Sequence, residues 1–135
     1  MKKIIWAFAV LGLLITGWVI AQEEEQELKI EQAVIAKDVD QEKREPVEPG
    51  DKFSAEVGKV YCFIRVTGAK GETEIKMAWY LGDKVVSEIP LKVKASTWRT
   101  WSYKTIDPAT MKGAWKVEIK DAGGKILTTL NFTIE

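Results

Sequence analysis

Apolar and polar residues alternate along the chain from Lys59 to its end, with the two-residue period of a β-strand that is covered on one face. Glycine, proline and aspartate interrupt the alternation at short intervals, and these residues favour turns. The pattern predicts six strands, at residues 59–67, 74–81, 85–93, 97–106, 113–120 and 126–135. Pro90 cannot donate a hydrogen bond to a neighbouring strand, so the third of these is expected to be an edge strand or to contain a bulge.

Alternation of this kind is typical of antiparallel sheets with one buried and one exposed face. The side chains expected inside are Val60, Cys62, Ile64, Val66, Ile75, Met77, Trp79, Leu81, Val85, Ile89, Leu91, Val93, Trp115, Val117, Ile119, Leu130, Phe132 and Ile134. With one more strand in front of them, about seven short strands predict an all-β, immunoglobulin-like antiparallel β-sandwich. An open barrel is the alternative.

The segment in front of these strands is acidic. Residues 29–39 fit a strand and, more loosely, a helix, and we favour the strand because the chain that follows is made of strands. Residues 40–51 are predicted to be an extended linker, since Pro46 and Pro49 disfavour a helix and the charge run Glu42 to Glu45 is typical of solvated surface. Residues 22–50 hold ten acids and four bases, so we interpret them as an acidic leader to a sandwich domain at 51–135.

Residues 1–21 have the pattern of a secretory signal peptide. Lys2 and Lys3 precede an apolar run at residues 4–20, and Ala21 is followed by Gln22 and several glutamates. We therefore predict cleavage after Ala21 and an exported bacterial protein that is periplasmic or extracellular. In the alternative, residues 4–20 remain as an anchor in the inner membrane, because about 17 apolar residues reach the lower limit for crossing a bilayer. Contact with a membrane is expected only in that case.

The composition excludes several chemistries. The chain has no histidine, the commonest general base, and its single cysteine is too few for a zinc site or an intramolecular disulfide. Cys62 lies among apolar residues and is expected to be buried. No glycine-rich phosphate loop occurs, and the fourteen bases and ten acids of residues 51–135 leave too small an excess to indicate nucleic acid. We expect no metal, no cofactor and no enzyme activity, with a carboxylate pair for glycan hydrolysis as the enzymatic alternative.

One strand concentrates aromatic residues. Trp98 should face one way and Arg99, Trp101 and Tyr103 the other, so both faces carry an indole and we expect the strand to lie between two layers. These four residues are the candidate ligand site, at which a sugar ring or a peptide aromatic could stack and Arg99 could donate hydrogen bonds. The alternative is structural: one indole is core, the other packs on a loop, and Arg99 covers a ring as a cation. An exposed strand edge is a further candidate for recruiting another chain.

Several short motifs occur together in a fixed order: Val60-Tyr61-Cys62-Phe63, Trp79-Tyr80, Trp98-Arg99-Thr100-Trp101-Ser102, Gly113-Ala114-Trp115-Lys116-Val117 and Phe132-Thr133-Ile134. Together they resemble the bacterial domain-of-unknown-function 2914 family, over roughly residues 53–135. The resemblance implies a small β-rich extracytoplasmic module and no particular reaction. It adds no catalytic residue.

These observations predict an exported, non-catalytic β-sandwich module that binds a protein partner or a component of the cell envelope. The alternative is a carbohydrate-binding module that uses Trp98, Trp101 and Tyr103, or, less favoured, a carboxylate-dependent glycan hydrolase. The expected partner is a protein or an envelope glycan, and not a nucleic acid.

Overall fold

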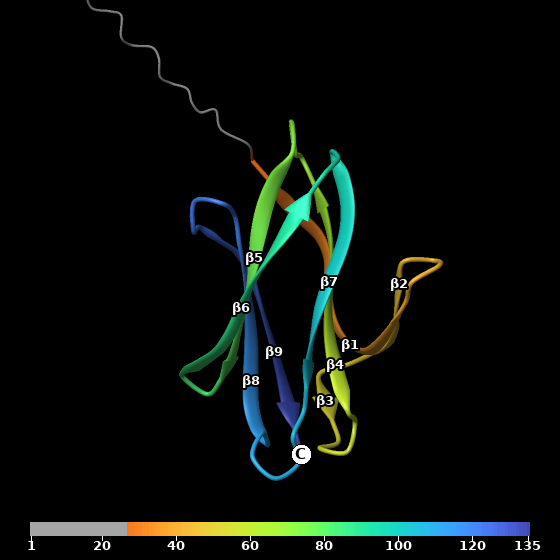
Figure 1. The fold of residues 1–135 in the computed structure, drawn as a ribbon, viewed down its shortest axis with the longest axis vertical. Coiled ribbons are helices and arrows are strands. Elements are labelled where there is room, and N and C mark those ends of the chain that lie inside the picture. Colours follow the sequence, from red (N-terminus) through yellow and green to blue (C-terminus); the bar gives the residue numbers. More distant parts are fainter. Residues whose placement is uncertain (1–26) are drawn as a thin grey trace, which may run out of the picture.

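The computed structural model describes residues 27–135, which form nine β-strands in two sheets that face each other (Figure 1). The predicted all-β sandwich is therefore confirmed, with nine strands in place of about seven. The strands are β1 (Lys29–Asp40), β2 (Glu45–Pro49), β3 (Lys52–Phe53), β4 (Lys59–Thr67), β5 (Thr73–Leu81), β6 (Lys84–Val93), β7 (Thr97–Thr105), β8 (Gly113–Lys120) and β9 (Ile126–Ile134). The first sheet has the order β2-β1-β4-β7 and the second β3-β9-β8-β5-β6.

The six strands predicted by alternation correspond to β4 through β9, with every end within one residue of its expected place. They pair in antiparallel fashion, and only the short β3 runs parallel to its neighbour β9 among the described strands. β6 lies at an edge of the second sheet, as Pro90 indicated. The two-residue period therefore identifies these strands and, apart from β7 and the start of β6, the face that each one buries.

Residues expected to form a leader and a linker are part of the first sheet. β1 is a strand, and its first part, Lys29 to Ala36, pairs with β4. Its last part, Ala36 to Asp40, pairs with β2, which lies inside the expected linker. The prolines of β2 are tolerated because β2 lies at the edge of the sheet, and proline within sheets is confined to edge strands, strand starts and bulges. The sheet thus begins at Lys29. Residues 45–49 are extended, as predicted for the linker at residues 40–51, but they form a paired strand, so the interpretation as a linker is wrong there.

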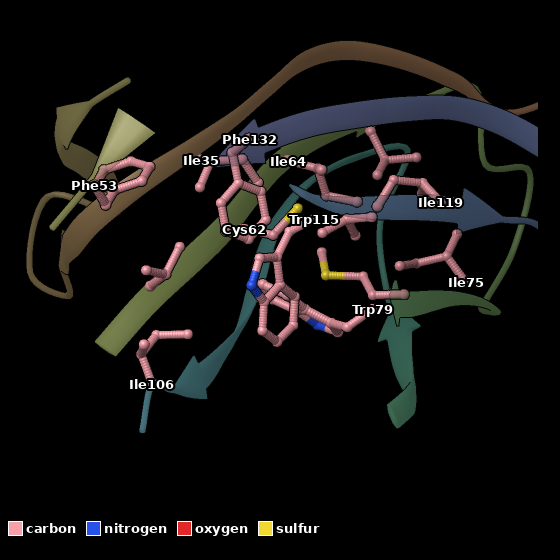
Figure 2. Packing of buried hydrophobic residues seen from close by; sticks show 14 of the residues in the cluster. Ile35, Phe53, Cys62, Ile64, Ile75, Trp79, Ile106, Trp115, Ile119 and Phe132 are labelled. Carbon is pink, nitrogen blue, oxygen red and sulfur yellow. The ribbon is translucent and has the colours of Figure 1, made fainter. Parts of the chain in front are cut away.

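The core lies between the sheets and is rich in aromatic rings (Figure 2). Trp115 and Phe132 stack with ring centroids 5.7 Å apart, and Trp79 meets each of them edge to face at 6.5 and 6.1 Å. Such arrangements add stabilisation to that of burial alone. Cys62 lies fully buried in the same cluster, as expected.

One inward prediction fails at β6. Val85 was expected inside, but it is 54% exposed. The register between β5 and β6 shifts at this point, because Trp79 pairs with Ser87 whereas the next residue, Tyr80, pairs with Val85. The extra residue, Val86, packs against the core in place of Val85. A bulge of this kind reverses the phase of alternation, so the period of the sequence cannot locate it.

No helix within residues 27–135 is long and apolar enough to cross a membrane. The predicted signal peptide, its cleavage after Ala21 and the alternative anchor at residues 4–20 all lie outside the described residues.

Candidate binding face on strands β4 and β7

Strands β4 and β7 pair along their whole length, and this pairing builds a row of side chains on the outer side of the first sheet. Tyr61 lies opposite Tyr103, Phe63 opposite Trp101 and Arg65 opposite Arg99. Residues that face each other across an antiparallel pair point to the same side. The alternate residues of β4, Val60 through Val66, fill the core, so the three pairs lie on the opposite side. We call these six residues the outer face.

The rings of the outer face contact each other across the strands. Phe63 and Trp101 stack with centroids 5.9 Å apart and planes 17° apart, whereas Tyr61 and Tyr103 are tilted at 5.3 Å. The ammonium group of Lys59 lies 4.7 Å from the centre of the Tyr103 ring. Phe63 is buried, Trp101 is half-buried and Tyr103 is 47% exposed. The row therefore ends in a large aromatic side chain that is available to a ligand.

The expected position of the aromatic strand between two layers is wrong, because β7 is an edge strand whose one paired neighbour among the described strands is β4. The cover over its indoles comes from the tip of the β1–β2 hairpin. The guanidinium carbon of Arg44 lies 5.3 Å from the ring centre of Trp98 and 5.5 Å from that of Trp101. The cation over the rings is therefore Arg44 and not Arg99.

Reciprocal hydrogen bonds hold this hairpin tip on β7. Arg44 Nη2 donates to the carbonyl oxygen of Arg99 at 2.6 Å. Arg99 Nη1 donates back to the carbonyl oxygens of Lys43 and Arg44 at 3.3 and 3.2 Å. The tip is shaped by Asp40, whose carboxylate accepts from two turn amides, and by a left-handed backbone at Arg44, φ 56°. The charge run Glu42 to Glu45, predicted to be solvated, includes this contact residue.

The inner side of β7 belongs to the core. Ser102 Oγ accepts a hydrogen bond from Trp79 Nε1 at 3.1 Å and donates to the sulfur of Met77. Trp98 is partly buried and packs against the core cluster. Of the four predicted site residues, Arg99, Trp101 and Tyr103 thus share the outer face, and Trp98 lies at the boundary where Arg44 reaches it.

A surface hollow of about 370 Å³ lies at the arginine end of the outer face, at the start of β7. Its lining consists of Arg44, Arg65, Thr97, Trp98 and Arg99. Arg65 Nη1 lies 3.6 Å from a carboxylate oxygen of Glu31. Neither Arg44 nor Arg99 has a carboxylate within 4 Å among the described residues.

The described part of the chain offers few groups that could act as a nucleophile or bind a metal ion. Burial raises the pKa of the Cys62 thiol from 9.0 to about 12, which keeps it protonated and unreactive. Within residues 27–135, no group of three or more acids and cysteines is placed to hold a metal ion. What the outer face offers is aromatic surface and arginine donors.

The fold is similar to that of a solved immunoglobulin-like protein. The crystal structure of an immunoglobulin-like protein from Pseudomonas aeruginosa superposes with a TM-score of 0.52 and 15% sequence identity, over 81% of this chain and 97% of that one. The class of the protein is therefore an immunoglobulin-like β-sandwich. The model of a family described as "Protein of unknown function (DUF2914)" matches residues 72–134, which confirms the resemblance to this family over those residues. Among curated proteins, none matches the sequence.

Proposed function

We propose that the protein is an exported, non-catalytic module that binds a carbohydrate component of the bacterial cell envelope on its outer face. The signal-peptide pattern of residues 1–21 supports export. The absence of histidine from the sequence and the protonated, buried Cys62 support a binding role over a catalytic one.

The observation that carries the proposal is the exposure of Tyr103 beside Trp101. A large aromatic ring that is 47% exposed on a regular strand covers no core, and its position is fixed by backbone pairing with Tyr61. Rings held in this way offer flat apolar surface, and a tyrosine adds a hydroxyl that can donate or accept a hydrogen bond. Sugar rings present apolar C–H faces and hydroxyl groups at their edges, so they match such a row in both respects.

The test is binding of the purified protein to a panel of envelope glycans, measured by co-sedimentation with insoluble polymers and by tryptophan fluorescence with soluble ones. Tyr103→Ala should weaken binding at least tenfold. The chain supplies a matched control in Tyr80, whose ring also lies under a lysine, Lys116, at 4.8 Å but on the other sheet. Tyr80→Ala should leave the affinity unchanged. Equal losses in both variants, or no binding to any glycan, would refute the proposal.

A protein partner is the second candidate, and the edge position of β7 favours it. An edge strand exposes unpaired backbone groups that an extended peptide can use for strand addition. A peptide bound in this way would protect backbone amides of β7 from hydrogen exchange, and its affinity would not change in Tyr103→Ala. That pair of results would favour strand addition over carbohydrate binding.

A further inference from the structure

We propose that the hollow lined by Arg44, Arg65 and Arg99 is an anion-binding site, which takes a carboxylate, sulfate or phosphate group of the glycan that binds the outer face. The inference rests on the proposed function and deepens it, because it assigns the ligand to the acidic glycans.

The distribution of arginine in the chain carries the argument. The sequence contains three arginines against seventeen lysines, and all three arginines line this one hollow. They come from three separate elements: the β1–β2 hairpin tip, β4 and β7. Arginine differs from lysine in its rigid, planar fork of N–H donors, which matches two oxygens of a carboxylate or phosphate at once. A fold that only needed positive charge here could use lysine, as it does elsewhere.

The hollow gathers three positive charges, of which only that of Arg65 is paired with a carboxylate within residues 27–135. Arg65 and Arg99 lie directly opposite each other across the strands, an arrangement that is unfavourable for like charges. Among the described residues, the one carboxylate within 4 Å of either arginine is that of Glu31, whose side chain is 48% exposed and reaches Arg65 at 3.6 Å. Arg44 and Arg99 are bonded to backbone carbonyls, which satisfy donors but carry no net charge. A bound anion would remove the repulsion between the three guanidinium groups.

Some N–H donors of these arginines also remain without an acceptor in the described structure. A guanidinium has five N–H groups, and the protein acceptors described above use only a few of those on each arginine. Nε of Arg65 is buried and has no hydrogen-bond partner among the described residues. That buried Nε is not open to the hollow, so an oxyanion would be bound by the terminal Nη groups, with which arginine can form two parallel hydrogen bonds.

The hollow and the aromatic row are placed to bind one molecule. Arg65 follows Phe63 by two residues and Arg99 precedes Trp101 by two, so the arginine pair is the next pair along the same face. Two residues of a strand span about 7 Å. The volume of about 370 Å³ lies in the range of small-ligand sites, about 300–1,000 Å³. A glycan chain with one sugar stacked on Tyr103, four residues from Arg99, could therefore place a charged substituent of a neighbouring sugar among the arginines.

The test compares dextran sulfate and polygalacturonate with neutral dextran, by calorimetry in dilute and in physiological salt, with inorganic sulfate as a competitor. Arg65→Gln should weaken binding of both acidic polymers at least tenfold, and Arg65→Lys should weaken it several-fold although the charge is kept. Lys76→Gln, which removes a charge on the other sheet, should have no effect. Arg99→Gln should also weaken binding, with far-UV circular dichroism to verify that the hairpin change has not unfolded the protein.

Three results would overturn the inference, and they differ from failure of the proposed function. Equal losses in Arg65→Gln and Lys76→Gln would show diffuse attraction without a site. Full affinity in Arg65→Lys would show that the guanidinium fork is not used. The third result is that the protein binds neutral dextran as tightly as the acidic polymers and that Tyr103→Ala still weakens this binding. The aromatic row would then remain a glycan site, but there would be no anion site. Loss of all glycan binding would instead refute the proposed function itself.

Discussion

The indole N–H of Trp79 on β5 donates a 3.1 Å hydrogen bond to the hydroxyl of Ser102 on β7, and this bond joins the two sheets of the sandwich. Trp79 is fully buried, and Ser102 is the one buried polar residue among those described. An indole N–H that has lost its contact with water must find an acceptor, and Ser102 supplies it. The aromatic strand is thereby fixed to the core from its inner side.

Removal of this acceptor should destabilise the protein. Ser102→Ala leaves the Trp79 N–H buried and unpaired, which costs about 1–3 kcal/mol in the free energy of unfolding. Urea titration followed by circular dichroism measures the change. Thr100→Ala is the control, since Thr100 lies two residues away on the same side of β7 and makes no side-chain hydrogen bond within the described structure. It should cost less than about 0.5 kcal/mol. Equal effects would mean that the hydrogen bond contributes nothing specific.

Alanine substitutions at two glycines can distinguish the cost of backbone strain from the cost of a steric clash. Gly68 and Gly58 have nearly the same positive φ, 92° and 87°, so alanine is strained at both by about 1–2 kcal/mol. A Cβ at Gly68 would lie 2.6 Å from the carbonyl oxygen of Glu27, whereas a Cβ at Gly58 would meet nothing within 4 Å. Gly68→Ala should therefore lose about 1–3 kcal/mol more than Gly58→Ala in thermal unfolding. Equal losses would show that the backbone at Glu27 moves to make room for the new Cβ, so that the clash has no cost.

The hairpin tip allows the cation–π contact to be measured. Arg44→Ala should destabilise by about 1–2 kcal/mol, because Trp98 and Trp101 lose their cover while the left-handed backbone remains strained. Arg44→Gly loses the same contact but relieves the strain, so it should be more stable than Arg44→Ala by up to about 1 kcal/mol. Both variants should shift tryptophan emission to longer wavelength. Unchanged emission would contradict the contact.

The thiol of Cys62 should make stability fall at alkaline pH. Its pKa is raised from 9.0 to about 12 by burial. Between these values the unfolded chain releases the proton and the folded chain keeps it, so unfolding becomes easier by about 1.4 kcal/mol per pH unit, while the full contribution is present below pH 9. Cys62→Ala removes this slope, and the difference between the two denaturation profiles isolates it from other titrating groups. The native thiol should also resist thiol reagents until the protein unfolds.

Much of the fold can be predicted from the sequence because two-residue alternation is a local signal. It places β4 and β8 with their observed ends and identifies Trp79 and Trp115 as core residues. Local signals fail where pairing overrides them. Pro46 and Pro49 indicate a linker, yet they lie in an edge strand that pairs with β1. Alternation places Val85 inside, but the register shift at Trp79 exposes it.

The candidate site was predicted only in part, since its members come from distant parts of the chain. Trp101 and Tyr103 lie within one aromatic strand, so composition alone draws attention to them. Arg44 is 55 residues from Arg99, and nothing in a run of four charges indicates that one of them folds back onto a strand so far along the chain. Long-range contacts of this kind depend on the sheet order, which periodicity does not determine.

The place of β4 in the first sheet sets the limits of the folding unit. Residues 72–134, which the family model matches, contain β5 through β9 but not β4, the paired neighbour of β7. A truncation that begins at Glu72 would leave β7 with both edges open and would strip away two of the three arginines. Boundaries drawn from sequence likeness alone would therefore cut through a hydrogen-bonded ladder, and the smallest fragment expected to fold cooperatively must reach back to Lys29.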